Sequence, residues 1–213
     1  MIIVSEKIFR SGILMLMASL CTLSSAKEID FNTTIPVEVR ESSVFKKPDY
    51  AINAIDHYEK IALSPGAEAL RKHLQDHYKV SHSETVQIVS SVFKYSDAHN
   101  MAPELVFSII DNESGFKPRA QSSRGARGLM QVLPVYHQDK IRVDGGSNDL
   151  LWKTDFNIKI GTRIFQEYLN KSRGNVREAL ARYNGSYGTN SGYPEKILRI
   201  KDKYRTYTKD IRI

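Results

Sequence analysis

Cysteine is almost absent from this 213-residue chain, which contains one, Cys21, at the end of a short apolar run near the N-terminus. Lipoprotein signals have a small residue before the acceptor cysteine, and Leu20 occupies that place here, so lipid attachment is not expected. If residues 1–26 are removed on export, the mature chain has no disulfide and no thiol nucleophile. Its stability must then come from its hydrophobic core.

Long apolar runs are also absent. The run from Ile13 to Leu23 is much shorter than the roughly 20 residues that a membrane-spanning helix needs, so we expect no stable membrane anchor. Lys7 and Arg10 precede this run and small residues ending at Ala26 follow it, which is the pattern of an export signal. We therefore predict a signal peptide, cleavage near Ala26 and location in the periplasm or cell envelope.

The chain has no block of five or more like charges, although its net charge is +7 at pH 7. Loss of the signal removes two positive charges, Lys7 and Arg10, and one negative charge, Glu6, which leaves +6. A basic exported protein suits an anionic polymer, and a cell wall with peptide carboxylates fits better than nucleic acid, for which no recognised motif is present. Charge alone is equally compatible with an ordinary soluble surface.

No alternating strand pattern of useful length and no repeat is visible, so we predict a mainly helical fold. Ser64-Pro65, Ser81 with Glu84, and Asn175 with Glu178 are typical of helix N-termini. The expected helices are 49–62, 65–79, 83–99, 103–113, 157–169, 176–184 and one from Pro194 towards Tyr204, with a short helix at 129–132 ended by Pro134 and a loop at 144–148.

Metal-binding patterns are weak. His73 and His77 lie four residues apart on an expected helix and His82 is near, but no HExxH motif or carboxylate partner accompanies them. A surface histidine pair is the simpler interpretation, and we expect neither a metal site nor a cofactor.

Glu113 has an unusual position for a carboxylate. With 100° per residue, the preceding helix has an apolar stripe about 140° wide, and Glu113 falls inside it. The stripe consists of Leu105, Val106, Ile109 and Ile110. Loss of water without a cationic neighbour raises the pKa of a carboxyl group, which suits a general acid. The alternative is that Glu113, at the end of the helix, points its side chain into solvent.

Tyr183 also lies on an apolar helix face, which it shares with Val176, Ala179 and Leu180. It therefore points inward, either as a core tyrosine or as part of a site.

Several short motifs occur together in the second half of the chain. They are Glu113-Ser114-Gly115, Gly125, Gly128-Leu129-Met130-Gln131, Asn157 with Gly161, and Ala181-Arg182-Tyr183-Asn184. In order and spacing they resemble the lytic transglycosylase family, whose catalytic domain has a goose-type-lysozyme-like fold. The resemblance implies a helical, lysozyme-like domain with a saccharide groove. The expected division is a signal peptide at 1–26, a linker and helical arm of unknown role at 27–82, a catalytic domain at 83–204 and a tail at 205–213.

The resemblance also implies roles for individual residues. Glu113 matches the family's single catalytic acid, and Ser122 matches a serine near the substrate's N-acetyl group. Tyr183 matches a tyrosine whose hydroxyl approaches the acid, with Asn184 supporting the same corner. Met130 and Gln131 match residues that form the floor of the groove. Gly125 and Gly128 match glycines of a loop that brings backbone close to sugar. Core filling is an equal alternative for Met130.

The implied reaction explains how one protein carboxylate can be sufficient for catalysis. Most glycosidases use two, one to protonate the leaving oxygen and one to activate water or attack carbon. Here the implied substrate is peptidoglycan, cleaved between N-acetylmuramic acid and N-acetylglucosamine. Its 2-acetamido oxygen stabilises the reacting carbon, and its own C6 hydroxyl attacks after Glu113 removes the proton. The product is a 1,6-anhydromuramic end, formed without water by a lyase step.

Two other functions stay open at this point. A lysozyme-type hydrolase would need a second carboxylate, for which Asp144 and Asp149 are candidates. A wall-binding accessory module would keep the groove without turnover. Size and export are also compatible with an enzyme that opens the wall for a cell-envelope-spanning secretion, conjugation or pilus apparatus.

Some side chains have no settled role. Arg127 and Gly185-Ser186 depart from the family's usual residues, and Arg127 is free to reach a peptide carboxylate or face solvent. Four aromatic residues either stack on sugar or pack in the core or rim, namely Tyr136, Trp152, Tyr187 and Tyr193.

Overall fold

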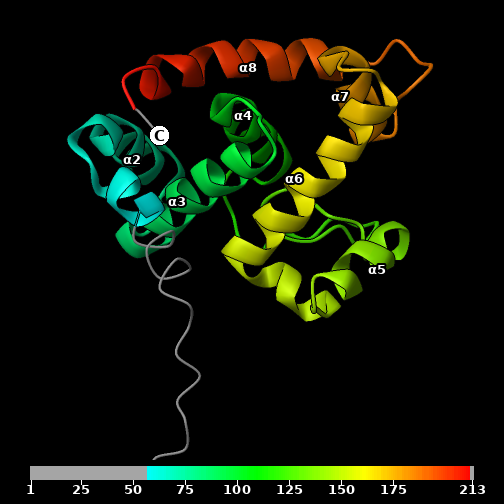
Figure 1. Cartoon of the computed structure of the whole chain (residues 1–213), viewed down its shortest axis with the longest axis horizontal. Helices are drawn as coiled ribbons and strands as arrows, with labels where there is room; N and C mark the ends of the chain where they lie inside the picture. Colours follow the sequence, from blue (N-terminus) through cyan, green and yellow to red (C-terminus); the bar gives the residue numbers. More distant parts are fainter. Residues whose placement is uncertain (1–56, 212–213) are drawn as a thin grey trace, which may run out of the picture. The chain divides into compact units, whose positions relative to one another are not determined.

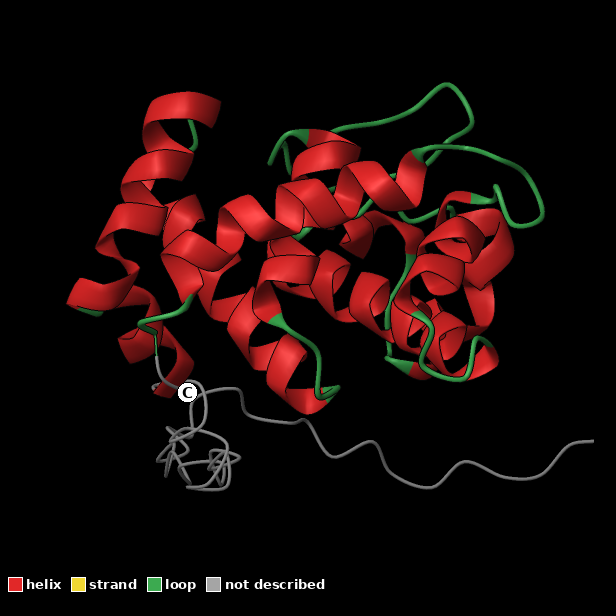
Figure 2. Cartoon of the chain, turned by 90° about the horizontal axis from the view of Figure 1, so that it is seen from above, coloured by secondary structure: helices red, strands yellow, loops and turns green. Residues whose placement is uncertain are grey.

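A computed structural model describes residues 57–211, which form helices joined by loops and contain no named strand in that range (Figures 1 and 2). Residues 57–63 are helical, and the elements that follow are α2 (Pro65–Tyr78), α3 (His82–Ala98), α4 (Pro103–Ser114), α5 (Pro134–Val143), the 3-10 helix η1 (Asn148–Trp152), α6 (Thr154–Lys171), α7 (Val176–Asn184) and α8 (Tyr193–Thr208). The predicted mainly helical fold is confirmed. The expected signal peptide, Cys21, the linker and the first half of the helix expected at 49–62 lie outside the described residues.

The predicted N-caps are present. The hydroxyl of Ser64 accepts from the backbone of Ala67, and that of Ser81 accepts from the backbone of Glu84 at 3.3 Å. The side chain of Glu84 does not return to the backbone as a full capping box requires, because it accepts a hydrogen bond from the hydroxyl of Thr154 instead. The start of α3 is thereby joined to the start of α6.

The region around Pro134 differs from the prediction. Residues 129–132 form turns that end in an isolated bridge between Arg127 and Val132, rather than a helix. Pro134 begins α5 instead of ending a helix. Proline lacks a backbone N–H and has a fixed φ, so it fits the first turn of a helix, where that N–H has no partner in any case.

Helix α4 lies at the centre of the packing. It contacts α3 and α8, and α8 crosses above it from the α2 side to α7 (Figure 1). The core between these helices is rich in fully buried aromatic side chains, among them Phe93, Phe107, Phe116 and Tyr204. Leu70 and Leu74 of α2 belong to the same core. Helix α2 therefore packs against α3 and α8, although the predicted division of the chain assigned residues 27–82 to a separate arm.

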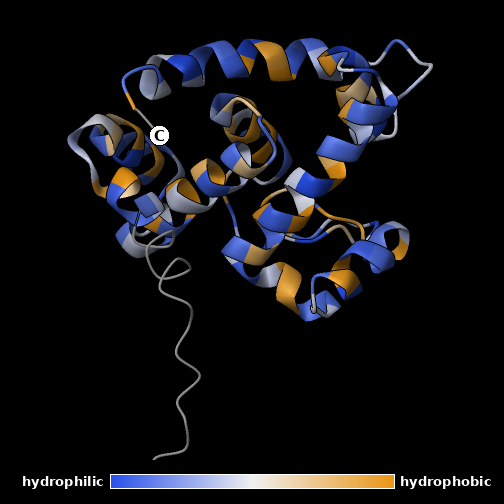
Figure 3. Ribbon diagram, in the orientation of Figure 1, coloured by the Kyte–Doolittle hydropathy of each residue, from blue (hydrophilic) through white to orange (hydrophobic). Residues whose placement is uncertain are grey.

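A second apolar cluster lies where α5 and η1 meet α6. It consists of Val132, Ile141, Leu151, Ile160 and Ile164. Hydrophobic and hydrophilic residues alternate around the helices, as expected for elements that bury one face (Figure 3). Within residues 57–211, no helix is both long and apolar enough to cross a membrane.

Asn157 of α6 joins three chain segments from a buried position. Its Oδ1 accepts from the backbone N–H of Met130 at 2.8 Å, and its Nδ2 donates to the carbonyls of Arg127 at 2.9 Å and Leu151 at 2.8 Å. Gly128 makes this approach possible, because a Cβ there would lie 2.2 Å from Nδ2 of Asn157. The motif loop before α5 is thus fixed to α6 by one amide.

We predict that Asn157→Ala lowers the free energy of unfolding by roughly 2–4 kcal/mol, because three buried backbone groups lose their partner. Chemical denaturation measures this loss. Asn190→Ala, in an exposed loop, is the control and should change stability by less than about 0.5 kcal/mol. Equal stability of both variants would contradict the role of Asn157.

Candidate active site

Glu113 lies one residue before the end of α4, partly buried at the edge of the core. All four residues of the predicted apolar stripe are buried, so the helical-wheel prediction is confirmed for them. Gly115 then ends the helix in the left-handed conformation with a φ of 55°. The C-terminal end of a helix carries partial negative charge, which also disfavours an ionised carboxylate there.

Two side-chain donors reach the same oxygen of Glu113. The hydroxyl of Tyr193, at the first residue of α8, donates to Oε1 at 2.5 Å, and Nδ2 of Asn112 lies 3.5 Å from it. Oε2 accepts no hydrogen bond from the described residues. The ammonium group of Lys196, one turn further along α8, adds a positive charge to the surroundings of the carboxylate.

Burial raises the pKa of the Glu113 carboxyl group above its ordinary value of 4.5. The hydrogen bonds from Tyr193 and Asn112 and the charge of Lys196 lower it, but less than burial raises it. The same burial, together with the charge of Glu113, raises the pKa of Tyr193, which stays protonated and acts as a donor. The carboxyl group of Glu113 therefore keeps its proton to a higher pH than a carboxyl group in water does.

The expected partner of Glu113, Tyr183, makes a different contact. Its hydroxyl donates to the carbonyl of Met130 at 2.7 Å, and its ring packs against Phe165 and Tyr168. Tyr183 is close enough for the charge of Glu113 to contribute to its pKa, which burial chiefly raises. The hydrogen-bond partner of the acid is therefore Tyr193, and Tyr183 positions the loop beside it.

Ser122 and Gln131 hold the motif loop in place. The hydroxyl of Ser122 accepts from the backbone N–H of Ala126 at 3.0 Å. Gln131 has a positive φ of 49°, and its Nε2 donates to the carbonyls of Ala120 at 3.1 Å and Gly128 at 3.0 Å. Both side chains are partly exposed.

Met130 is not part of an exposed groove floor. Its side chain is fully buried and packs against Gly161, where a Cβ would lie 2.5 Å from the sulfur. The core alternative for Met130 is therefore the one observed. Gly125 has a positive φ of 82° and no close neighbour, whereas Gly128 serves the contact with Asn157. Asn184 is exposed at the end of α7.

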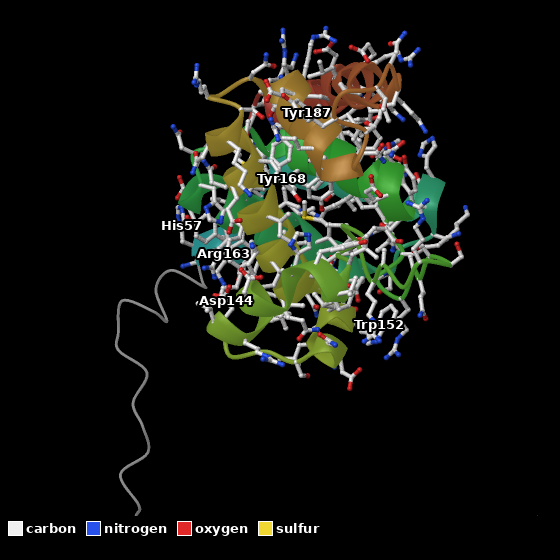
Figure 4. The ribbon with its side chains drawn as sticks, turned by 90° about the vertical axis from the view of Figure 1, so that its right-hand side faces the viewer. His57, Asp144, Trp152, Arg163, Tyr168 and Tyr187 are labelled. Carbon is white, nitrogen blue, oxygen red and sulfur yellow. The ribbon has the colours of Figure 1, made fainter. Side chains whose placement is uncertain are left out.

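Both candidates for a second carboxylate have basic partners of their own. Burial alone would raise the pKa of Asp144, but Lys159 at 2.8 Å and Arg163 at 2.6 Å lower it below its usual value. The pair of Asp144 and Arg163 is visible in Figure 4. Asp149 is 89% exposed and lies 3.4 Å from Arg127.

The unassigned side chains form contacts of their own. Arg127 lies over the ring of Trp152 at 5.3 Å and donates to the carbonyl of Asn148 at 3.0 Å. Arg182 lies over the exposed ring of Tyr187 at 3.6 Å. Tyr136 is exposed on α5. Of the four aromatic residues considered from the sequence, only Tyr193 contacts the acid.

The histidine pair packs as aromatic side chains do. His73 is buried and stacks on Tyr207 at 5.0 Å, with the ring of His77 at 4.3 Å. In the part of the chain that is described, no group of three or more His, Cys, Asp or Glu is placed to hold a metal ion.

The contacts that two important residues make were not predicted from the sequence. Tyr193 lies 80 positions from Glu113, and only the packing of α8 on α4 brings them together. Its one local signal is the following Pro194, which indicates a helix start but no partner. Asn157 was recognised as part of a motif, yet its three hydrogen bonds depend on tertiary contacts.

Residues 57–211 thus form a helical domain with a partly buried acid at the end of a central helix. The family model described as Transglycosylase SLT domain matches residues 90–196, and the chain belongs to this family. A curated relative, "Transglycosylase" of Enterobacteria phage PRD1, is 32% identical over 112 residues, which are 49% of this chain and 39% of the relative.

Two solved structures have a similar fold. The inactive mutant of lytic transglycosylase Slt from Pseudomonas aeruginosa superposes with a TM-score of 0.52 at 15% identity, over 76% of this chain and 38% of that one. The 70 kDa soluble lytic transglycosylase Slt70 from Escherichia coli superposes with a TM-score of 0.53 at 20% identity, over 76% of this chain and 30% of that one. The predicted fold class is confirmed. This chain spans about two-fifths or less of the length of these relatives.

We predict that Glu113→Gln stabilises the protein at neutral pH. The folded carboxyl group binds its proton more tightly than the unfolded one, so wild-type stability falls as pH rises from about 4.5 through the folded pKa. Glutamine keeps an acceptor for Tyr193 and removes this penalty, which is about 1.4 kcal/mol for a pKa difference of one.

Denaturation at pH 4 and pH 7 measures the effect, and the gain should be smaller at pH 4. The control is Glu68→Gln, an exposed residue of α2 paired with Arg71, which should stabilise at neither pH. A stability gain that is equal at both pH values would contradict the elevated pKa.

Proposed function

We propose that this protein is a lytic transglycosylase that cleaves peptidoglycan between N-acetylmuramic acid and N-acetylglucosamine without water. The observation that supports this most is the partly buried carboxyl group of Glu113, with a raised pKa and a hydroxyl donor from Tyr193. Membership of the Transglycosylase SLT domain family and the fold shared with Slt and Slt70 support it further.

In the proposed reaction Glu113 acts first as an acid. Its proton passes to the glycosidic oxygen as the bond from that oxygen to the muramic C1 breaks. The substrate's acetamido oxygen stabilises the positive charge that develops at C1. Both protein donors bind Oε1 of Glu113, so Oε2 is the oxygen available for proton transfer.

Glu113 then acts as a base. Its carboxylate takes the proton of the C6 hydroxyl, whose oxygen forms the new bond to C1, and the 1,6-anhydro ring closes. The enzyme regains the proton that it gave, so the reaction is balanced without water. An intramolecular hydroxyl has a large advantage over a water molecule because its position is already fixed.

Hydrolysis by a lysozyme-type mechanism would need a second carboxylate near the reacting carbon. The strong ion pairs of Asp144 and the exposure of Asp149 argue against either in that role. Among the described residues, the groups that set the pKa of Glu113 include no other carboxylate. The lyase reaction is therefore the better match to this site.

Export is part of the same proposal. The basic start, short apolar run and small residues at 1–26 support a signal peptide and action in the periplasm or cell envelope. Service to a secretion, conjugation or pilus apparatus is a further proposal. Deletion of residues 27–56 tests it better than deletion to residue 82, because α2 belongs to the core.

We predict that wild-type digestion of purified peptidoglycan gives anhydromuramic ends, detected by mass spectrometry as products lacking one water. Glu113→Gln should reduce the rate at least about a hundredfold, because acid–base catalysis is lost. Glu68→Gln, on α2, should retain full activity. Reducing ends in the wild-type products, or full activity of Glu113→Gln, would refute the proposal.

We further predict that Tyr193→Phe moves the alkaline limb of the pH–rate profile to higher pH. The lost hydroxyl favours the ionised carboxylate, so its removal raises the pKa of Glu113 further. Tyr183→Phe is the matched control, because its hydroxyl binds the carbonyl of Met130. It should lower the rate without moving the limb, and an equal shift in both variants would show that Tyr193 has no specific role.

A further inference from the structure

A cavity of about 660 Å³ lies beside the loop that follows the acid and does not include Glu113. Three junctions of the chain border it, namely the link between α2 and α3, the loop 116–120, and the turn between η1 and α6. Trp152 is at the lower right of Figure 4, far in that view from Tyr168 and Tyr187. The cavity is therefore separate from the α7 end of the domain.

The lining of this cavity is strongly cationic. Lys79, Lys117, Arg119 and Lys153 are exposed there, and none of the four forms an ion pair within residues 57–211. The one acidic residue in the lining is Glu84, which accepts a hydrogen bond from Thr154. Four cations against one engaged carboxylate leave a positive field that is not neutralised by neighbouring side chains.

Two further features add to this lining. Helix α3 begins at the cavity with its N-cap Ser81, and the partial positive charge of a helix N-terminus has the same sign as the side chains. The walls between the cations include the partly exposed apolar side chains of Val80, Pro118 and Trp152. Separated cations around an apolar wall fit an extended chain with several carboxylates better than a compact phosphate.

The loop 116–120 connects the cavity to the active site. Phe116 follows Glu113 by three positions and is buried in the core against Tyr78, at a ring distance of 4.7 Å. At the other end of the loop, the carbonyl of Ala120 accepts from Gly128 N–H at 2.9 Å and from Gln131 Nε2 at 3.1 Å. A ligand in the cavity thus contacts the same loop that joins the acid to the motif residues.

We propose that this cavity binds the carboxylate-bearing stem peptide of a peptidoglycan strand, so that the enzyme selects glycan that carries peptides. The identity of the ligand rests on the proposed function; the cationic cavity itself does not. The lysines and the arginine pair with the peptide carboxylates, and the apolar wall contacts its aliphatic side chains.

The test is calorimetric binding of a synthetic stem peptide to the Glu113→Gln variant. Replacement of three cations, in Lys117→Gln/Arg119→Gln/Lys153→Gln, should weaken binding by about tenfold or more. The control has the same loss of charge on exposed residues at the C-terminal end of α8, Lys203→Gln/Arg205→Gln/Lys209→Gln, and should bind like the parent. Equal unfolding midpoints establish that both variants are folded.

Two further peptides test whether binding depends on the charge of the peptide or on its sequence. The stem peptide with its carboxylates amidated should not bind measurably, and an unrelated acidic peptide of equal charge should bind more weakly. Absence of stem-peptide binding, equal binding of the amidated form, or equal weakening in both triple variants would overturn the site. Equal binding of the unrelated peptide would overturn its assignment to stem peptides.

Digestion distinguishes this inference from the proposed function. The wild type should cleave peptide-bearing strands faster than peptide-free strands, and the cavity variant should lose that difference while still cleaving both. A protein that binds in the predicted pattern but cleaves no wall contradicts the proposed function alone. One that cleaves both strands equally and does not bind the peptide contradicts the inference alone.

Discussion

The contact between the Glu113 carboxyl group and the Tyr193 hydroxyl is the interaction on which the site depends. It is made at the packed edge between α4 and α8, where the acid loses water and lies at the negative end of a helix. The neutral hydroxyl of Tyr193 offsets part of the cost of burying the Glu113 carboxylate without forming an ion pair with it. The carboxyl group can then hold its proton to a higher pH than a free glutamate does and still act as a base after giving it up.

The motif residues around this contact divide into two groups. Glu113 and the partly exposed Ser122 and Gln131 lie where a ligand can reach them. Met130, Gly128, Gly161 and Asn157 instead form a buried frame in which one amide fixes the loop and two glycines allow close packing. The frame explains why these residue types occur together even though few of them are available to a substrate.

Local signals were sufficient for most of the helices. The caps at Ser64, Ser81 and Asn175 and the apolar stripe before Glu113 depend on short-range chemistry, and each is present. Pro134 was assigned to the wrong end of a helix because proline is tolerated both at a first turn and after a last one. The choice of Tyr193 over Tyr183 as the partner of the acid is set by the packing of α8 on α4, which no local pattern reveals.

The central claim is that burial outweighs hydrogen bonding and leaves the Glu113 carboxyl group with a raised pKa. An NMR titration of its side-chain carboxyl carbon, assigned by comparison with Glu113→Gln, measures this value directly in the free protein. The account predicts a single titration with a midpoint above 4.5. A midpoint at or below 4.5, or two steps that show coupling to another carboxylate, would contradict it.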